Sequence, residues 1–190
     1  MGNLIFEGML PPENKLRVGE KAIDFSLPGN NGGDWRLSDN LGKVIALLFY
    51  PQSETLVCTK QLCSIRDHWA DYLETKAVVI GVSPGTVEKH QEFAQKYRLP
   101  MPLLVDEGRK ITQLFGKHSW MPISLTRAIV IIDAKGIIRH RKVMFRGFRP
   151  KDYAVISSIY EAKTDASQDR FEELLNKHRE KMKGKRSFSK

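Results

Sequence analysis

The chain has 190 residues, of which 41% are hydrophobic and 28% charged, and its formal net charge is +9. This length suits one domain with a substantial core plus extensions, and the composition is that of an ordinary globular protein. No apolar run reaches the roughly 18 residues of a spanning helix, and the first residues lack the basic region of a signal peptide. The sequence therefore predicts a cytoplasmic protein with no membrane span.

Strand-like and helix-like segments alternate along the chain. Residues 22–27 and 34–37 flank a Gly- and Asn-rich segment and predict a small N-terminal β-hairpin. Unbroken apolar runs, typical of strands buried on both faces, lie at 44–50, 77–82, 102–105 and 128–132. Helices are predicted at 58–73, 86–97, 109–115 and 152–161. The turn Asp133–Gly136 leads into a last strand at 137–145.

This order predicts an α/β fold with a mixed central sheet flanked by helices and an N-terminal β-hairpin extension. The sheet is expected to be mixed because its last two strands form an antiparallel hairpin. We expect the domain to occupy residues 15–163, between an N-terminal extension at 1–14 and a basic C-terminal tail at 164–190.

The positive charge is concentrated in two stretches. Seven Lys or Arg and one Glu lie between Lys177 and the C-terminus, and a second basic stretch runs from Arg139 to Lys151. Such stretches fit either solvated surface or an anionic partner. Apart from Phe145 and Phe148 they contain no stacking aromatic residues, and no nucleic-acid-binding motif occurs, so no nucleic-acid partner is expected.

The two cysteines, Cys58 and Cys63, are the candidates for chemistry. Two cysteines are too few for a disulfide framework, and a permanent bridge is not expected in a reducing cytoplasm. Their spacing, with five scattered histidines, is not that of a zinc site, so neither a metal nor a cofactor is predicted. Redox chemistry and plain core packing remain as the alternatives.

Cys58 follows the apolar run 44–50, at the carboxyl end of a predicted strand, where open α/β sheets bind their ligands. Thr55 is the predicted N-cap of the next helix, which puts Cys58 in its first turn. The free N–H groups and the dipole of a helix N-terminus favour an anion there. That position favours a cysteine thiolate, which is the nucleophilic form.

The spacing of the two cysteines limits how they can interact. In an unbroken helix Cys63 lies about 140° around the axis from Cys58, with the two Cα atoms roughly 8–9 Å apart. A disulfide needs a Cα–Cα distance below about 7 Å. A bond between them would therefore require the helix to unwind locally, so we expect it to form during turnover.

The segment Pro51-x3-Thr55-x2-Cys58 matches the Pro-x3-Thr-x2-Cys signature of the peroxiredoxins, and CTKQLCSIRD at 58–67 resembles the peroxiredoxin Q (bacterioferritin comigratory protein) branch. Similarity to the family covers about residues 16–162. The resemblance implies a thioredoxin-like fold and a thiol-dependent peroxidase that reduces hydrogen peroxide or organic hydroperoxides. It also implies recycling by thioredoxin or a similar dithiol, in a monomer or a homodimer.

The resemblance assigns a role to five residues. It implies that Cys58 is the peroxidatic cysteine and that Cys63 is the resolving cysteine, which forms a disulfide with it. Thr55 would hydrogen-bond the peroxide, Pro51 would shield the thiolate, and Arg127 would hold the thiolate and polarise the peroxide.

Three other hypotheses about the function remain open. Cys63 could be a core residue of a one-cysteine peroxidase. A thioredoxin-like disulfide oxidoreductase is disfavoured, because the chain lacks Cys-x-x-Cys and has Thr126 rather than Pro before Arg127. The same fold could also serve as a redox sensor or binding module whose basic tail meets a partner.

Overall fold

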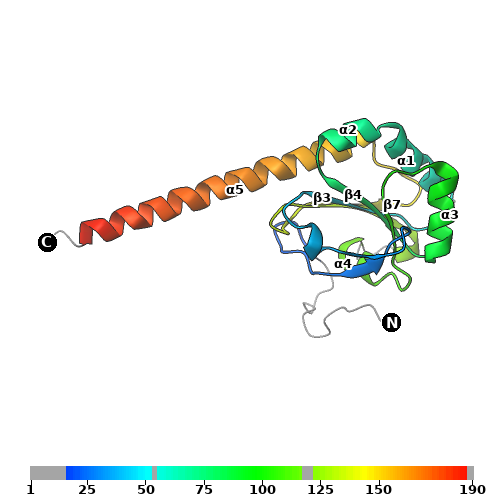
Figure 1. Cartoon of the computed structure of the whole chain (residues 1–190), viewed down its shortest axis with the longest axis horizontal. Helices are drawn as coiled ribbons and strands as arrows, with labels where there is room; N and C mark the ends of the chain where they lie inside the picture. Colours follow the sequence, from blue (N-terminus) through cyan, green and yellow to red (C-terminus); the bar gives the residue numbers. More distant parts are fainter. Residues whose placement is uncertain (1–15, 53–54, 117–121, 188–190) are drawn as a thin grey trace.

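The structure of the protein is a computed structural model that describes residues 16–52, 55–116 and 122–187. For Leu125, Arg170 and residues 177–187 it describes the backbone alone. The centre of the domain is a five-stranded sheet in the order β5-β4-β3-β6-β7 (Figure 1). Its strands are β3 (Ile45–Phe49), β4 (Val78–Ser83), β5 (Leu103–Val105), β6 (Thr126–Ile132) and β7 (Ile138–Phe145). A separate antiparallel pair is formed by β1 (Ser26–Pro28) and β2 (Asp34–Arg36).

The sheet is mixed, as predicted. β3 pairs parallel with β4 and antiparallel with β6, and β6 pairs antiparallel with β7. The helices are α1 (Leu56–Asp67), α2 (Trp69–Glu74), α3 (Val87–Tyr97), α4 (Lys110–Gly116) and α5 (Asp152–Ser187). Two short 3-10 segments are η1 (Ser38–Asn40) and η2 (Ile123–Leu125). The α/β fold with an N-terminal hairpin is thereby confirmed.

Each face of the sheet has its own hydrophobic core. Successive side chains of a strand point to opposite faces, so Ala46 and Leu48 of β3 belong to one core while Ile45, Leu47 and Phe49 belong to the other. The first core receives side chains from α1, α2, α3 and the beginning of α5. The second is covered by α4 and the β1–β2 pair. Burial on both faces explains why these strands are unbroken apolar runs.

The predicted helix 58–73 is two helices, because the chain breaks at His68. This residue has φ −107° and ψ 22°, and its ring Nδ1 lies 2.9 Å from the carbonyl oxygen of Ser64. The break rotates the residues that follow. Tyr72 is therefore buried, and Leu73, the last residue of the predicted helix, is 60% exposed.

The last helix is much longer than the predicted segment 152–161. α5 contains no Gly or Pro before Gly184, so nothing in its sequence interrupts a helix. Its first turns lie on the domain, where Ala162 is still buried. Asp169 and Glu173 still pair with Arg139 and Lys135 of the domain, and the C-terminal part of the helix projects beyond it (Figure 1). The helix continues without a break across the predicted boundary at 163/164. None of the helices in the described ranges has an apolar stretch long enough to cross a membrane.

Candidate functional site

The sheet topology brings two of the predicted site residues to one edge. α1 begins after the carboxyl end of β3, and the antiparallel strand β6 begins beside that end, with Phe49 opposite Ala128. Alternation along β6 then places Arg127 on the same face as Ile129 and Ile131. This is the face that α1 covers, so Cys58 and Arg127 meet although they are 69 residues apart in sequence.

Thr55 is the N-cap of α1, as predicted. Its backbone is extended, with φ −73° and ψ 146°, and its Oγ1 accepts a hydrogen bond from the backbone N–H of Cys58 at 3.4 Å. Cys58 lies in the first turn and is only 1% exposed. The sulfur therefore lies at the positive end of the helix dipole and away from bulk water.

Arg127 is the cation of the site. Its side chain is 1% exposed, and its Nη2 donates to the Sγ of Cys58 at 3.2 Å and to the carbonyl oxygen of Arg146 at 3.5 Å. Its Nε and Nη1 are buried with no hydrogen-bond partner among the described residues. A buried guanidinium is costly unless it is paired, and the N–H groups left over here could donate to an oxygen atom.

Pro51 is buried at the end of β3, in the segment that leads to α1. Its carbonyl oxygen accepts a hydrogen bond from Nη2 of Arg109 at 3.0 Å. Arg109 adopts a left-handed backbone conformation, with φ 53°, and burial lowers its pKa. No sequence pattern points to Arg109, because its partner is a backbone carbonyl 58 residues away.

Cys63 lies on the same continuous helix as Cys58 and is partly buried. Both cysteines are free thiols. The helix between them is unbroken, as the sequence predicts. Helix geometry therefore keeps their Cα atoms farther apart than a disulfide allows. The parts of the chain that the structure describes contain no group of three or more His, Cys, Asp or Glu side chains suited to a metal ion.

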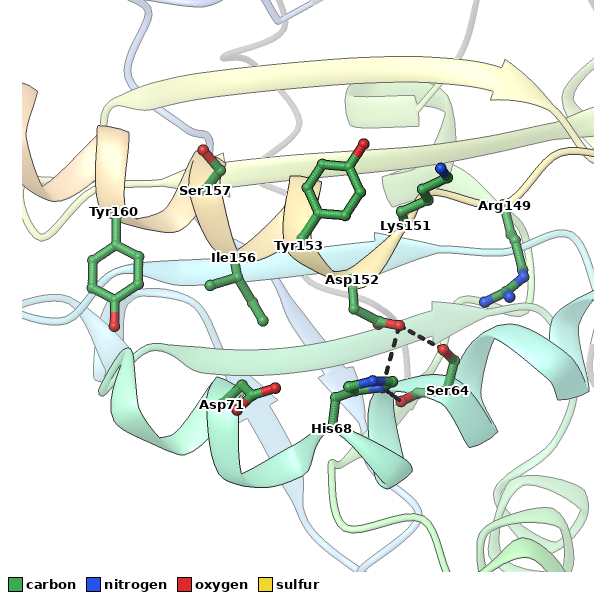
Figure 2. Close-up of a pocket in the computed structure, with 10 residues that line it drawn as sticks. All are labelled: Ser64, His68, Asp71, Arg149, Lys151, Asp152, Tyr153, Ile156, Ser157 and Tyr160. Atoms are coloured by element: carbon green, nitrogen blue, oxygen red, sulfur yellow. Dashed lines mark hydrogen bonds and ion pairs between the residues drawn. The ribbon is translucent and has the colours of Figure 1, made fainter.

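A second polar cluster lies just beyond Cys63, beside a pocket of about 650 Å³ between α1, α2 and α5. There Asp152 accepts a hydrogen bond from Ser64 Oγ at 2.5 Å (Figure 2). It accepts a second one from Tyr72 OH at 2.9 Å. Nδ1 of His68 lies 3.7 Å from the same carboxylate. Sequence reasoning missed this cluster, because a Ser, a Tyr and an Asp without regular spacing carry no motif.

Removing the cap of α1 is expected to cost stability. Thr55→Ala deletes the oxygen that accepts from the Cys58 N–H, so we expect a loss of about 0.5–2 kcal/mol in the free energy of unfolding. Thr55→Ser, which keeps the hydroxyl, should lose much less. Urea unfolding of the reduced proteins measures both, and equal stability of Thr55→Ala and wild type would contradict the expected role of the cap.

Protonation of His68 is expected to stabilise the junction of α1 and α2. The Ser64 carbonyl, then the carboxylates of Asp152, Asp71 and Asp67, raise the pKa of His68 above 6.5. Arg149 and Lys151 also line this pocket and oppose the effect.

A raised pKa means that the folded protein binds the proton more tightly than the unfolded chain. The added stability is therefore complete below about pH 6.5 and is lost as the pH rises through the folded value. We expect the stability difference between wild type and His68→Gln to shrink from pH 6 to pH 8 in urea titrations. A difference that is constant or grows with pH would show that the ring is not stabilised in its charged form.

Comparison with known proteins gives a consistent result. Residues 18–141 match the AhpC/TSA family. Over 130 residues, 64% of this chain and 81% of the relative, the chain is 44% identical to Peroxiredoxin Bcp of Bacillus subtilis (strain 168). It is 39% identical over 127 residues to the chloroplastic Peroxiredoxin Q of Triticum aestivum, which covers 66% of this chain and 58% of that one.

A solved structure shares the fold. The crystal structure of peroxidoxin BcpB from Mycobacterium tuberculosis aligns with a TM-score of 0.64 at 29% identity, over 77% of this chain and 97% of the other. The thioredoxin-like fold implied by the resemblance is confirmed by these structural neighbours. The chain belongs to the AhpC/TSA family and is a peroxiredoxin similar to the Bcp and Q proteins, a membership that implies thiol-dependent peroxidase activity.

Proposed function

We propose that the protein reduces hydrogen peroxide and organic hydroperoxides with Cys58 as the peroxidatic cysteine and Cys63 as the resolving cysteine. Thioredoxin or a similar dithiol then reduces the disulfide. The observation that carries this proposal is the 3.2 Å contact between Arg127 Nη2 and Cys58 Sγ, buried in the first turn of α1. A cation and a helix N-terminus together stabilise the thiolate that must attack the peroxide.

In the first step the Cys58 thiolate attacks one oxygen of the O–O bond. The S–O bond forms as the O–O bond breaks, and the departing oxygen leaves as water or an alcohol after it takes up a proton. Negative charge grows on that oxygen in the transition state, so N–H donors placed nearby lower the barrier. Arg127 has two buried nitrogens that no described residue engages in a hydrogen bond, and they can donate to that oxygen. The Thr55 hydroxyl can donate to the peroxide while its oxygen accepts from the Cys58 N–H.

In the second step the sulfenic acid of Cys58 condenses with Cys63. The S–S bond forms, the S–O bond breaks and water leaves. A dithiol donor restores both thiols by exchange. Pro51, tied to Arg109, would hold the segment before α1 over the sulfur. We place this cycle in a reducing compartment such as the cytoplasm, where free thiols persist.

The test is turnover with a complete reducing system. Wild-type protein supplied with thioredoxin, thioredoxin reductase and NADPH should consume hydrogen peroxide at a rate proportional to enzyme, and Cys58→Ser should consume none above background. Insulin reduction by the dithiol form, without peroxide turnover, would instead support a disulfide oxidoreductase. An absence of both activities would favour the redox-sensor reading.

A further inference from the structure

The carboxylate of Asp152 joins three elements of the fold. Asp152 begins α5, and its carboxylate accepts hydrogen bonds from Ser64 in α1 and from Tyr72 in α2. The carboxylate also lies 3.7 Å from His68 at the junction of α1 and α2; Figure 2 shows the contacts with Ser64 and His68. The Asp152 side chain is only 14% exposed, so these hydrogen bonds are little weakened by competing water. The Tyr72 hydroxyl remains a donor, because burial and then the Asp152 charge raise its pKa.

Asp152 is held on a rigid support. Val155, Ile159 and Ala162, in the following turns of α5, are all buried in the core that α1 and α2 share. Nζ of Lys163, the next residue, donates to the carbonyl oxygen of Thr75, at the end of α2. The packing of α5 therefore fixes the position of the Asp152 carboxylate, and the hydrogen bond from Ser64 holds the C-terminal part of α1 to it.

Ser64 is the residue next to Cys63, so its hydrogen bond to Asp152 holds the turn of α1 that carries the proposed resolving cysteine. In the helix the Cα atoms of Cys58 and Cys63 are roughly 8–9 Å apart, and a disulfide requires less than about 7 Å. The turns that carry Cys63 must unwind for the bond to form. As they unwind, the Ser64 side chain has to leave Asp152.

We infer that Asp152 is a positioning residue for the resolving step: it is a latch that keeps the Cys63 end of α1 helical and so limits the rate of disulfide formation. The inference rests on the proposed function of Cys63. Peroxide has already oxidised Cys58 to the sulfenic acid. Cys63 then supplies the attacking sulfur, the S–S bond replaces the S–O bond, and hydroxide leaves as water with the Cys63 proton.

The latch would also decide the fate of the oxidised enzyme. While α1 stays helical, the sulfenic acid of Cys58 stays apart from Cys63, and a second peroxide can oxidise it to the sulfinic acid. Stronger contacts with Asp152 lengthen the lifetime of the sulfenic acid. Weakening the Asp152 contacts should therefore speed disulfide formation and protect Cys58 from over-oxidation.

The experiment is a single turnover, quenched with an alkylating reagent and analysed by mass spectrometry for disulfide and sulfinic acid. Ser64→Ala removes one hydrogen bond to the Asp152 carboxylate. Asp152→Asn removes the negative charge of that carboxylate. Ser157→Ala is the matched control, because Ser157 lines the same pocket but bonds to Glu161 within α5.

A hydrogen bond to a charged group contributes enough for Ser64→Ala to form the disulfide about tenfold faster than wild type. The first oxidation should stay within about twofold. Less sulfinic acid should accumulate at high peroxide, and the Ser64→Ala/Asp152→Asn double variant should be no faster than the faster single variant. A merely structural role would lower the melting temperature without changing the ratio of disulfide to sulfinic acid. Rates equal to or slower than wild type in both single variants, or equal acceleration in Ser157→Ala, overturn the latch.

A second measurement separates the latch from the chemistry. Hydrogen exchange in the reduced protein should be faster at the α1 amides in Ser64→Ala than in wild type and unchanged in Ser157→Ala. Unchanged exchange in Ser64→Ala overturns the latch. If exchange rises as expected but wild type forms no disulfide, the assignment of Cys63 as resolving cysteine fails instead.

Discussion

Replacing Arg127 with methionine is expected to slow the oxidation of Cys58 by hydrogen peroxide about 10²–10³-fold, the usual effect of deleting one transition-state donor. The guanidinium is the buried cation 3.2 Å from the sulfur, and it carries the donors available to the peroxide. Methionine is similar in length and suits the apolar core around it, so the fold should persist. Stopped-flow kinetics under pseudo-first-order conditions measures the rate constant.

Arg141→Met is the matched control. Like Arg127, Arg141 lies on a strand; it is partly buried, donates to the carbonyl oxygen of Phe115, and has its pKa lowered by burial. It should react like wild type. Arg127→Lys, which keeps the charge but not the planar set of donors, should fall between wild type and Arg127→Met. Wild-type kinetics in Arg127→Met would remove Arg127 from the reaction.

Replacing Cys63 with serine is expected to separate the two steps. The first oxidation should keep the wild-type rate constant, because the donor placed on the Cys58 sulfur is Arg127, which Cys63→Ser leaves in place. Turnover supported by thioredoxin should fall at least tenfold, since no intramolecular disulfide can form. The sulfenic acid would then persist and accumulate as sulfinic acid.

The one-cysteine alternative gives the opposite result. If Cys63 only fills space in α1, Cys63→Ser should turn over at the wild-type rate with a small-molecule dithiol and with thioredoxin. Mass spectrometry of the oxidised wild type should then show no mass loss of two hydrogens. Both assays on the same pair of proteins decide between the two mechanisms.

Much of the fold follows from local sequence signals. Strands buried on both faces, such as β3 and β6, are unbroken apolar runs, and the turn Asp133–Gly136 marks the hairpin between β6 and β7. The Thr55 cap was likewise visible, because a Thr three residues before Cys58 is a local pattern. Each of these features depends on residues that are close together in the sequence, so it can be predicted from a local pattern.

The features that were missed depend on contacts between distant segments. The break at His68 shifts Tyr72 into the core. Its hydroxyl donates to Asp152, a contact that becomes evident only when α5 is placed against α2. Arg109 donates a hydrogen bond to the backbone carbonyl of Pro51. Because every residue has a backbone carbonyl, the type of residue at position 51 does not indicate this contact. Arg127 was named only through resemblance to the peroxiredoxins, because one Arg at the start of a strand is ordinary until its sulfur partner is placed beside it.

The most direct test of the account is stopped-flow oxidation of the reduced protein by hydrogen peroxide, followed by tryptophan fluorescence and by thiol loss, with Cys58→Ser as the control. The account predicts a rate constant orders of magnitude above that of a free thiol, and no fast phase in Cys58→Ser. Reaction of wild type no faster than a free thiol, with organic hydroperoxides as well, would contradict it, because the buried contact with Arg127 would then not activate the sulfur.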